Sequence, residues 1–431
     1  MKQNNFKIIV LVTFSVFAVI GVLLFAGIGG LSKGTPIRPV VIWGTVESGV
    51  MNELLKQMGL ELKEFARVSY AQKDPRTYEQ EFIEALASST GPDILLLSQD
   101  LLVAHRNKIF ALPYDNFNER LFKDTFIEEG ELFTDESGVI GMPFLIDPLV
   151  LYWNRTVFSN KGIAKPPVYW EELFTLAPKL IERDNASNIA KSAIAFGEYT
   201  NIDHAKEILS ALIIQADSTI TAYNIQGDLQ SVLGDRGEYP VPPSEAALRY
   251  YTEFSNPVQN VYSWNRSLPH SKQMFIAGDL AMYIGFASEF TELRRLNPNL
   301  NFDVALLPQS KGVEEKSTYG DLTAMVVMRT SPYLNAAFQT VITLSEKKAG
   351  EVVSAELLLP SVRRDLLSVT DTDAYTSVFN RSALFARGWL DPDRDATDVI
   401  FKTMVEDVTS GRFRLQQAVQ NAHKELSRVS K

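Results

Sequence analysis

The sequence predicts an α/β protein that is preceded by one N-terminal transmembrane helix. Short apolar runs that suit buried strands alternate with amphipathic stretches that suit helices along the first part of the main domain. An uncharged, largely apolar run extends from Ile8 to Ser32, and a helix that crosses a bilayer takes roughly 20 apolar residues. The alternation indicates the fold class, and the run indicates where the chain meets a membrane.

The flanks of the apolar run predict its orientation. Lys2 and Lys7 precede it, and the positive-inside rule leaves such lysines in the cytoplasm and sends the residues after the span outside. A cleavable signal peptide usually has an apolar region of about 7 to 15 residues, so the length favours an uncleaved anchor. The small residues at 26–30 leave cleavage open, and a cleaved chain would be secreted. We expect residues 1–36 to be an anchor or signal segment and the main domain to be extracytoplasmic.

Composition limits the kinds of partner. The chain has 431 residues, of which 45% are hydrophobic, and a net charge of −10. It can bury an ordinary core, but it lacks the basic surface that nucleic acid requires. The absence of cysteine excludes disulfides, thiol catalysis and cysteine zinc sites, and the four histidines are not spaced as a helical metal pair. We therefore expect no cofactor, no metal and no nucleic-acid partner.

The first predicted elements alternate between strand and helix. Residues 39–44 form an apolar run typical of a buried strand, and residues 68–70 and 93–97 follow as further short strands. An amphipathic segment at 48–64 lies between the first two, and Thr77 with Gln80 predicts a capping box at the start of a helix before the third. Such alternation is typical of a largely parallel sheet covered by helices on both faces.

A second stretch begins after Gly141-Met142-Pro143. Residues 149–153, 281–286, 302–307 and 324–328 read as strands, whereas the residues from 396 onward read as helices. A segment rich in glycine, aspartate and proline at 227–243 predicts a surface loop. The chain therefore divides into two α/β stretches.

Several local patterns occur in the order found in a known family. They lie at residues 91–94, 141–143, 152–155, 167–173, 274–282, 307–308 and 359–363. In these motifs the chain, from about Val40 onward, resembles extracellular solute-binding protein family 1. This family comprises the maltose-binding-protein-like receptors of carbohydrate importers of the ABC type.

The resemblance implies a two-lobed clamp of the periplasmic-binding-protein type II, in which each lobe is a mixed sheet flanked by helices. We expect a hinge near residues 144–148, close to the break at Gly141-Met142-Pro143. The expected segments are 37–145 for lobe 1, 146–290 for lobe 2, 291–348 for lobe 1 again, and 349–431 for lobe 2 with the C-terminal helices.

Sugar recognition requires flat aromatic faces for the C–H surface of a pyranose and carboxylates or amides for its hydroxyls. Ligands of open α/β sheets lie beyond the carboxyl ends of the strands, so candidates are sought there. The candidate ligand-binding residues are Trp43, Glu47, Asp100, Asp147, Trp264, Phe286, Glu289, Tyr319, Asp321 and Trp389.

Some of these candidates have structural alternatives of similar weight. Trp43 suits a core position, Asp100 suits a helix N-cap, and Asp147 before Pro148 suits a turn. Trp389 corresponds to a late aromatic residue of the family that reaches the ligand, and its alternative role is to anchor the last helices.

Trp264 stands in a polar stretch without helical periodicity, which favours ligand stacking. Phe286 replaces the tryptophan that the family often has at this place. Tyr319-Gly320-Asp321 replaces the paired glycines of relatives, which makes Tyr319 and Asp321 contacts particular to this chain.

Two motifs resemble metal-binding sites, but a structural role explains each of them better. Residues 391–395 resemble the start of a calcium loop, yet Ala396 and Lys402 stand where an EF-hand needs glycine and glutamate, so a solvated turn that caps the next helix is favoured. Tyr250 and Tyr251 resemble the paired tyrosines of ferric-ion receptors, yet the helical spacing of their neighbours favours core packing.

The resemblance implies a monomeric receptor without enzymatic activity, which closes around a sugar or oligosaccharide and presents it to an ABC permease. Two alternatives remain open at this stage. An extracellular carbohydrate-active hydrolase needs two carboxylates about 5 to 10 Å apart. A scaffold or adhesion domain would keep the clamp without a ligand.

Overall fold

The computed structural model describes residues 40–60, 68–313, 315–368 and 373–430. The expected transmembrane helix within residues 1–36 lies outside these ranges. Within them, no helix combines the length and the apolar character that crossing a bilayer requires.

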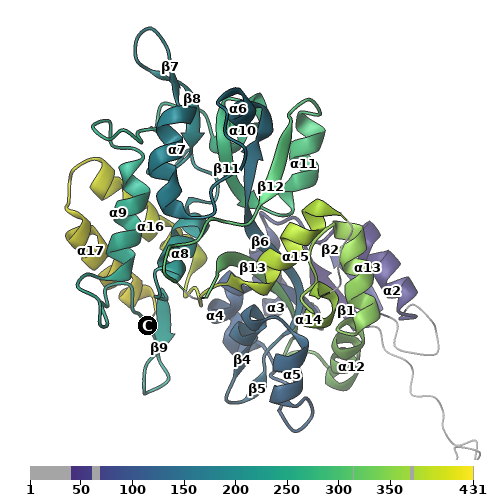
Figure 1. Ribbon diagram of the computed structural model, residues 1–431. Coiled ribbons are helices and arrows are strands. Elements are labelled where there is room, and N and C mark those ends of the chain that lie inside the picture. Colours follow the sequence, from purple (N-terminus) through teal and green to yellow (C-terminus); the bar gives the residue numbers. More distant parts are fainter. Residues whose placement is uncertain (1–39, 61–67, 314, 369–372, 431) are drawn as a thin grey trace, which may run out of the picture.

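The chain forms two lobes, each with its own hydrophobic core, and a continuous mixed sheet runs from one lobe into the other (Figure 1). The strand order along the sheet is β2-β1-β3-β13-β6-β11-β8-β7, with β12 beside β6 and β14 beside β13. The pairs β1–β2 and β1–β3 are parallel, whereas β13 is antiparallel to both β3 and β6. The predicted α/β class and the two-lobed arrangement are therefore confirmed.

Lobe 1 is defined as the elements that pack around the core containing Ile42, Leu96 and Val326. Apolar residues facing both sides of β3 (Ile94–Ser98) are buried, as expected for a strand covered on both faces. Its other elements are β1 (Val40–Gly44), α2 (Ser48–Gln57), β2 (Val68–Gln72), α3 (Tyr78–Ala87), η1 (Gln99–Leu101), α4 (Leu102–His105), η2 (Arg106–Lys108), α5 (Glu119–Thr125), η3 (Glu128–Phe133), β4 (Thr134–Asp135), β5 (Gly138–Val139), α12 (Leu334–Leu344), α13 (Lys347–Leu357) and α14 (Arg364–Leu367).

Lobe 2 is defined as the elements around the core containing Leu151, Phe196 and Ile284. Its central helix α8 (Ala205–Gln215) is buried on nearly every side. Its other elements are α6 (Arg155–Asn160), η4 (Trp170–Glu172), α7 (Leu173–Leu180), β7 (Glu182–Arg183), β8 (Ile189–Ile194), β9 (Thr221–Tyr223), β10 (Leu229–Ser231), α9 (Pro243–Glu253), α10 (Ser271–Ala277), β11 (Leu280–Phe286), α11 (Glu289–Leu296), β12 (Phe302–Ala305), α16 (Arg394–Thr409) and α17 (Leu415–Val429).

Two long strands connect the lobes. The first part of β6 (Met142–Asn154) pairs with β13 in lobe 1, and the part from Leu149 onward pairs with β11 and β12 in lobe 2. β13 (Thr318–Val327) begins beside lobe 2 and ends in the core of lobe 1. The chain leaves lobe 1 for the last time through α15 (Ala374–Leu384) and β14 (Ala386–Arg387).

The expected segment boundaries differ from these crossings in two places. Leu293 and Phe302 belong to the core of lobe 2, because β12 pairs with the second part of β6, so the return to lobe 1 comes at β13 and not at residue 291. Ala349 and Val353 belong to the core of lobe 1, because α13 packs against α2. The last crossing therefore comes after α15 and not at residue 349.

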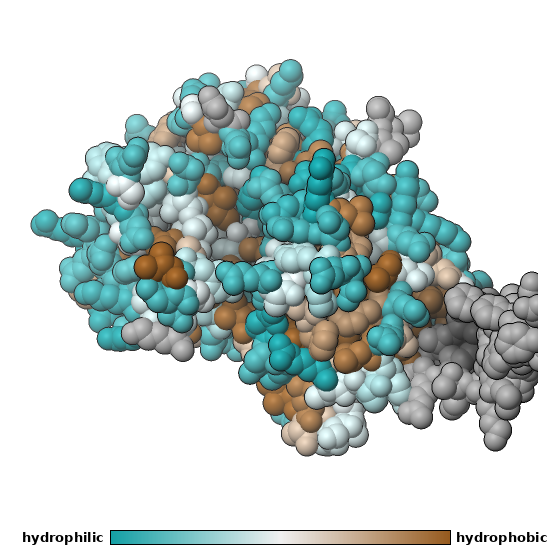
Figure 2. Space-filling view, turned by 90° about the horizontal axis from the view of Figure 1, so that it is seen from below, coloured by the Kyte–Doolittle hydropathy of each residue, from teal (hydrophilic) through white to brown (hydrophobic). Residues whose placement is uncertain are grey.

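Local predictions are also refined. α3 begins after Thr77, but the Thr77 hydroxyl donates to Glu81 Oε1 at 2.7 Å, and no side chain caps the helix, so the predicted capping box is wrong. Tyr251 is fully buried, and the Tyr250 hydroxyl donates to the Trp170 carbonyl, which confirms their structural role. Figure 2 shows a mainly hydrophilic lower face with hydrophobic side chains in small separate groups.

Candidate functional site

Polar and aromatic residues from both lobes meet where β6 and β13 cross between them. The cross-strand neighbours of β13 include Ser98 at the end of β3, opposite Thr323, and Asp147 in the middle of β6, opposite Asp321. Phe286 at the end of β11 lies opposite Leu149 of β6. We call Ser98, Asp100, Asp147, Phe286, Tyr319 and Asp321 the hinge site.

Asp147 and Asp321 form the centre of the hinge site. Directly opposite residues of an antiparallel pair project from the same face of the sheet, and their Cβ atoms lie roughly 4.5–5.5 Å apart. Asp321 Oδ1 accepts a hydrogen bond from the Ser98 hydroxyl at 2.9 Å, and Asp147 Oδ1 accepts one from the Ser288 amide at 3.0 Å. One oxygen of each carboxyl group is therefore held by the protein.

Burial raises the pKa of both carboxyl groups. Desolvation, reinforced by the charges of Asp100 and Asp147, raises the pKa of Asp321 to about 7. Desolvation, reinforced by the charge of Glu289, raises the pKa of Asp147 to about 6. Near neutral pH the pair therefore offers hydrogen-bond acceptors and, in the protonated fraction, a donor as well.

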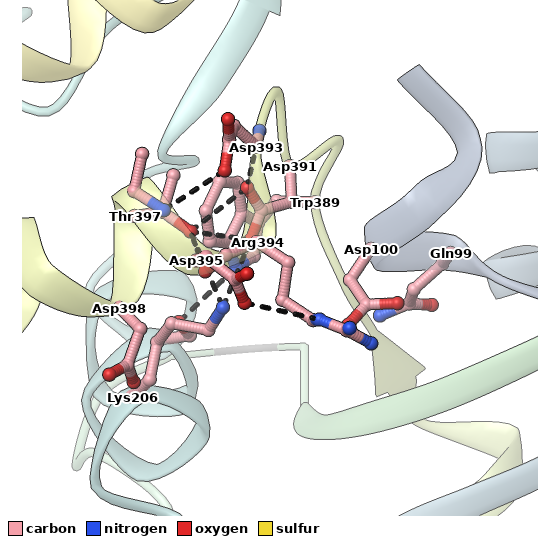
Figure 3. A network of polar contacts seen from close by, with 12 residues as sticks. Gln99, Asp100, Lys206, Trp389, Asp391, Asp393, Arg394, Asp395, Thr397 and Asp398 are labelled. Atoms are coloured by element: carbon pink, nitrogen blue, oxygen red, sulfur yellow. Dashed lines mark hydrogen bonds and ion pairs between the residues drawn. The ribbon is translucent and has the colours of Figure 1, made fainter. Parts of the chain in front are cut away.

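Asp100 faces lobe 2 across the gap between the lobes. Arg394 at the start of α16 extends toward it, with Nη1 3.7 Å from Asp100 Oδ2 (Figure 3). The Arg394 Nη2 atom also lies 3.6 Å from Glu79 Oε2 of α3. Asp100 Oδ1 is buried without a hydrogen-bond partner among the described residues. Asp100 does not cap a helix through its side chain, since no side-chain capping bond is formed at η1 or α4. Its carboxylate instead joins the two lobes.

A buried ion pair supports Arg394 from behind. Lys206 of α8 donates to Asp391 Oδ2 at 3.0 Å, and the Thr397 hydroxyl donates to the same carboxylate (Figure 3). Asp393 caps α16 by accepting from the Ala396 amide at 2.9 Å. The predicted cap is confirmed, and Asp393 and Asp395 are exposed as expected of a solvated turn, whereas Asp391 is only 2% exposed and is neutralised by Lys206.

Tyr319 is tied to lobe 1 by Gln99. The Gln99 side chain is fully buried, and its Nε2 donates to the Tyr319 hydroxyl at 3.1 Å and to the Gly320 carbonyl at 2.9 Å. Gln99 Oε1 accepts from the Leu322 amide at 3.2 Å. The tyrosine ring lies 6.4 Å from that of Phe286, in an edge-on arrangement.

The carboxylate of Glu289 is bonded to other residues of the protein. Its carboxylate accepts hydrogen bonds from the Tyr283 hydroxyl at 2.7 Å and the Phe286 amide at 3.1 Å, and pairs with His204 at 2.5 Å and Lys272 at 3.3 Å. Burial opposes its ionisation, but the hydrogen bond and charge of His204 outweigh burial and lower the pKa of Glu289 to about 2. The expectation of a ligand contact is not met here, because Glu289 positions Phe286 and His204 instead.

Phe286 keeps a place at the edge of the hinge site. It is only partly buried, and its ring meets that of His204 edge-on at 4.8 Å. His204 stands in the left-handed backbone region, with φ of 61°, at the N-terminus of α8. The two rings and the pair of aspartates together give the site an aromatic side and an acidic side.

Trp264 and Trp389 are core residues in this structure, which contradicts their predicted stacking on a ligand. Trp264 is fully buried in lobe 2, and its indole donates to Asn201 Oδ1 at 3.1 Å. Trp389 is 3% exposed, donates to the Ser210 hydroxyl at 3.2 Å and stacks on Phe401. Neither ring offers a free face, because each sits among the helices of lobe 2; Trp389 thus fills the alternative role of anchor.

Trp43 lies near the end of β1, and Glu47 lies directly before α2. The Trp43 ring is half-buried, and Lys73 Nζ lies 3.6 Å from its centroid. Glu47 is exposed before α2 without capping it. Among the described residues, no hydrogen bond, ion pair or ring contact connects either residue with the hinge site.

Several residues of the surroundings had no signal in the sequence. Glu129 of η3 is 2% exposed, and burial raises its pKa to about 8. Glu207 of α8 lies near enough to raise the pKa of Asp321. Glu129, Glu207 and Arg394 come from helices far apart in the chain, so only the folded arrangement brings them to the site. Across the part of the chain that the structure describes, no group of three or more histidine, aspartate or glutamate residues is arranged to hold a metal ion.

The family model for bacterial extracellular solute-binding proteins matches residues 61–349. The chain therefore belongs to this family, which consists of binding proteins and not of enzymes, and the predicted resemblance is confirmed. A binding protein of Brucella abortus (strain 2308) is 21% identical over 272 residues, which span 62% of this chain and 62% of that protein's own length.

Two solved structures illustrate the likeness in fold. A cyclo/maltodextrin-binding protein complexed with maltotetraose is 16% identical, with a TM-score of 0.74, covering 92% of this chain and 98% of that one. The sugar-binding protein MalE of Xanthomonas citri is also 16% identical, with a TM-score of 0.74, covering 91% of this chain and 97% of that one. At such identity the likeness establishes the two-lobed fold.

Proposed function

We propose that this extracellular solute-binding protein captures a sugar or oligosaccharide between its lobes. The observation that carries the proposal is the facing pair Asp147 and Asp321 at the crossing of the lobes, with Phe286 beside it. Carboxylates accept several hydroxyl hydrogen bonds, and an aromatic ring packs on the apolar face of a pyranose. The sugar ligands named for proteins of the same fold support the same class of solute.

Hinge motion about β6 and β13 is the proposed mechanism of capture. A ligand that contacts both lobes only when they are together shifts the population toward the closed form. The ion pairs of Arg394 with Asp100 and Glu79 join the lobes in the same way, so they assist closure.

Delivery and location form the remaining part of the proposal. The ligand-loaded clamp would pass its solute to an ABC permease, in keeping with the family resemblance. Residues 1–36 would hold the protein at the membrane, as their apolar run and preceding lysines predict.

A thermal-shift screen of the purified full chain tests the proposal. Mono- and oligosaccharides are compared with amino acids and polyamines, and the solute is analysed afterwards. A ligand that binds only the folded state adds about 2.7 kcal/mol of stability at a hundredfold excess over its Kd. We expect a saturable shift with one class of sugar, recovered unchanged.

Asp321→Asn is the informative variant, and Asp235→Asn in an exposed loop of lobe 2 is the matched control. Loss of the shift in the first and its retention in the second would support the hinge site. A shift with polyamines or amino acids alone would reject the sugar, and no shift with any solute would favour a scaffold role.

A further inference from the structure

A cavity of about 420 Å³ lies outside the hinge site, where lobe 2 meets α15. The residues that line it lie within 165–169 before α7, within 305–313 from the end of β12, within 316–318 up to the start of β13, and within 381–385 at the end of α15. Its volume falls within the range of about 300–1,000 Å³ that is typical of small-molecule sites. In Figure 1 α15 runs across the centre of the molecule, between the two lobes.

Apolar side chains form the walls of this cavity. Val168, Tyr169 and Val313 are exposed at its rim, with exposed fractions of 61%, 39% and 42%. Leu307, which is buried, and Phe385 at the end of α15 also line it. A ligand with an apolar body would find its complement here.

The charged side chains that line the cavity have one sign, although the carboxylate of Glu172 accepts from the Val168 amide beside it. Lys165, Lys316 and Arg381 line it, and none of its lining residues is an aspartate or a glutamate. No ion pair connects any of the three cations with another described residue. In a chain whose net charge is −10, such a group of cations favours an anion.

One polar side chain among the residues that line the cavity also lacks a hydrogen-bond partner in the described part of the chain. The Ser382 side chain is 1% exposed, and its hydroxyl makes no hydrogen bond within the described residues. An unpaired buried hydroxyl costs free energy, which a bound acceptor would recover. Ser382 and Arg381 both line this cavity, so a ligand that fills it lies beside both residues.

We propose that this cavity is a second ligand site, distinct from the sugar site, which binds a small organic carboxylate that carries an apolar ring or short chain. The carboxylate pairs with Arg381 and the neighbouring lysines and accepts from Ser382, and the apolar body packs against Val168, Tyr169 and Phe385. A simple inorganic anion would leave these apolar walls empty, and a neutral sugar would leave the cations unpaired.

The site also touches the crossing between the lobes. Thr318, the first residue of β13, donates its amide to the Phe385 carbonyl at 3.1 Å and its hydroxyl to the Leu149 carbonyl of β6 at 2.8 Å. Thr318 and Phe385 both line the cavity. A bound carboxylate therefore contacts residues at which the chain passes between lobes.

Fluorine NMR with the purified full chain tests the proposal in the absence of sugar. The probe is 4-(trifluoromethyl)benzoate, with 4-(trifluoromethyl)benzamide and 4-(trifluoromethyl)benzylammonium as neutral and cationic analogues. We expect saturable broadening of the benzoate signal, much weaker broadening by the amide, and none by the ammonium. Equal behaviour of the three probes, or no saturable binding of the benzoate, would overturn the proposal.

Val168→Glu places an acidic group at the rim without disturbing a buried side chain. It should weaken benzoate binding about fivefold or more, which is the effect of one like charge at about 4 Å in water. Val258→Glu is the matched control, because Val258 is 87% exposed and does not line the cavity. Equal weakening in both variants would show a general charge effect and contradict the site.

Arg381→Gln gives an independent variant, with Arg295→Gln on the exposed face of α11 as its control. The first should weaken benzoate binding and the second should not. Because no sugar enters the assay, its result stands whether or not the hinge site binds sugar. A sugar affinity that is unchanged in Val168→Glu would further separate the two sites.

Discussion

Asp147 of β6 and Asp321 of β13 lie directly opposite each other, at the position where both strands pass between the lobes. Like charges facing each other across a strand pair are destabilising, and burial adds to the effect. The protein keeps two carboxyl groups where packing alone would favour apolar residues. Because the pKa of both groups is raised, we expect the crossing to respond to pH.

Stability should fall as the pH rises through the range set by Asp321. Its pKa is about 7 in the folded protein and lies near 3.8 for the unfolded group, so the unfolded chain releases this proton first. The folded state therefore loses stability between about pH 4 and pH 7. In Asp321→Asn, the free energy of unfolding should fall by about 1–2 kcal/mol less over this pH range than in the native protein. Urea unfolding of both proteins at pH 5 and pH 8 measures this change in the free energy of unfolding. If the change between the two pH values is the same in the variant, Asp321 is not the group responsible.

Glu289 should act in the opposite direction. Its pKa falls from 4.5 to about 2 on folding, so its contribution is present above about pH 4.5 and is lost as the pH falls toward 2. Glu289→Gln should cost about 2 kcal/mol at pH 7, because it weakens hydrogen bonds to a charged acceptor. Unfolding of both proteins at pH 7 and pH 3 should show the difference shrinking at the lower pH. A constant difference would point to a packing effect.

Arg394 should affect closure more than folding. Its ion pairs with Asp100 and Glu79 are 3.7 and 3.6 Å long and its side chain is 40% exposed, so Arg394→Gln should change stability by less than about 1 kcal/mol. Loss of these contacts between lobes should increase the radius of gyration measured by solution X-ray scattering. Arg412→Gln, which removes a pair within lobe 2, is the control. Equal radii in the two variants would exclude the proposed role.

Trp264 should behave as a core residue. Trp264→Phe removes buried volume and the hydrogen bond to Asn201, and should cost about 2–4 kcal/mol without changing ligand affinity. Trp43→Phe, at a half-buried ring, should cost less. Denaturant unfolding and ligand titration of both variants check this, and weakened binding with native stability in Trp264→Phe would restore the stacking role.

The sequence predicts the ends of a strand well where the strand is uniformly apolar. Where a strand carries polar residues, the predicted strand is shorter than the one in the structure. β3 and β11 were placed within one residue of their ends, because their apolar runs are continuous. Only residues 149–153 of β6 and 324–328 of β13 were expected. Asp147 before Pro148 resembles a turn in sequence, and Tyr319-Gly320-Asp321 precedes the expected strand, yet both segments lie inside strands because β6 and β13 pair with each other there.

The candidate site was predicted in part for the same reason. Asp100, Asp147, Phe286, Tyr319 and Asp321 follow strand ends or interrupt strands, and the fold brings them together. The prediction that Trp264 stacks on a ligand is wrong, because a polar stretch without periodicity can still bury its one large ring. The residues next to Trp264 in the sequence indicate neither how exposed its ring is nor which residue its indole bonds.

The sequence by itself determined the α/β class, the family and the division into two stretches, because these depend on local periodicity and on motifs close together in the chain. Tertiary structure alone decided where the chain crosses between lobes, that Asp391 is buried against Lys206, and that Arg394 reaches Asp100. These contacts join residues separated by more than a hundred positions. Packing between distant segments of the chain determines these contacts, and no local sequence pattern predicts them.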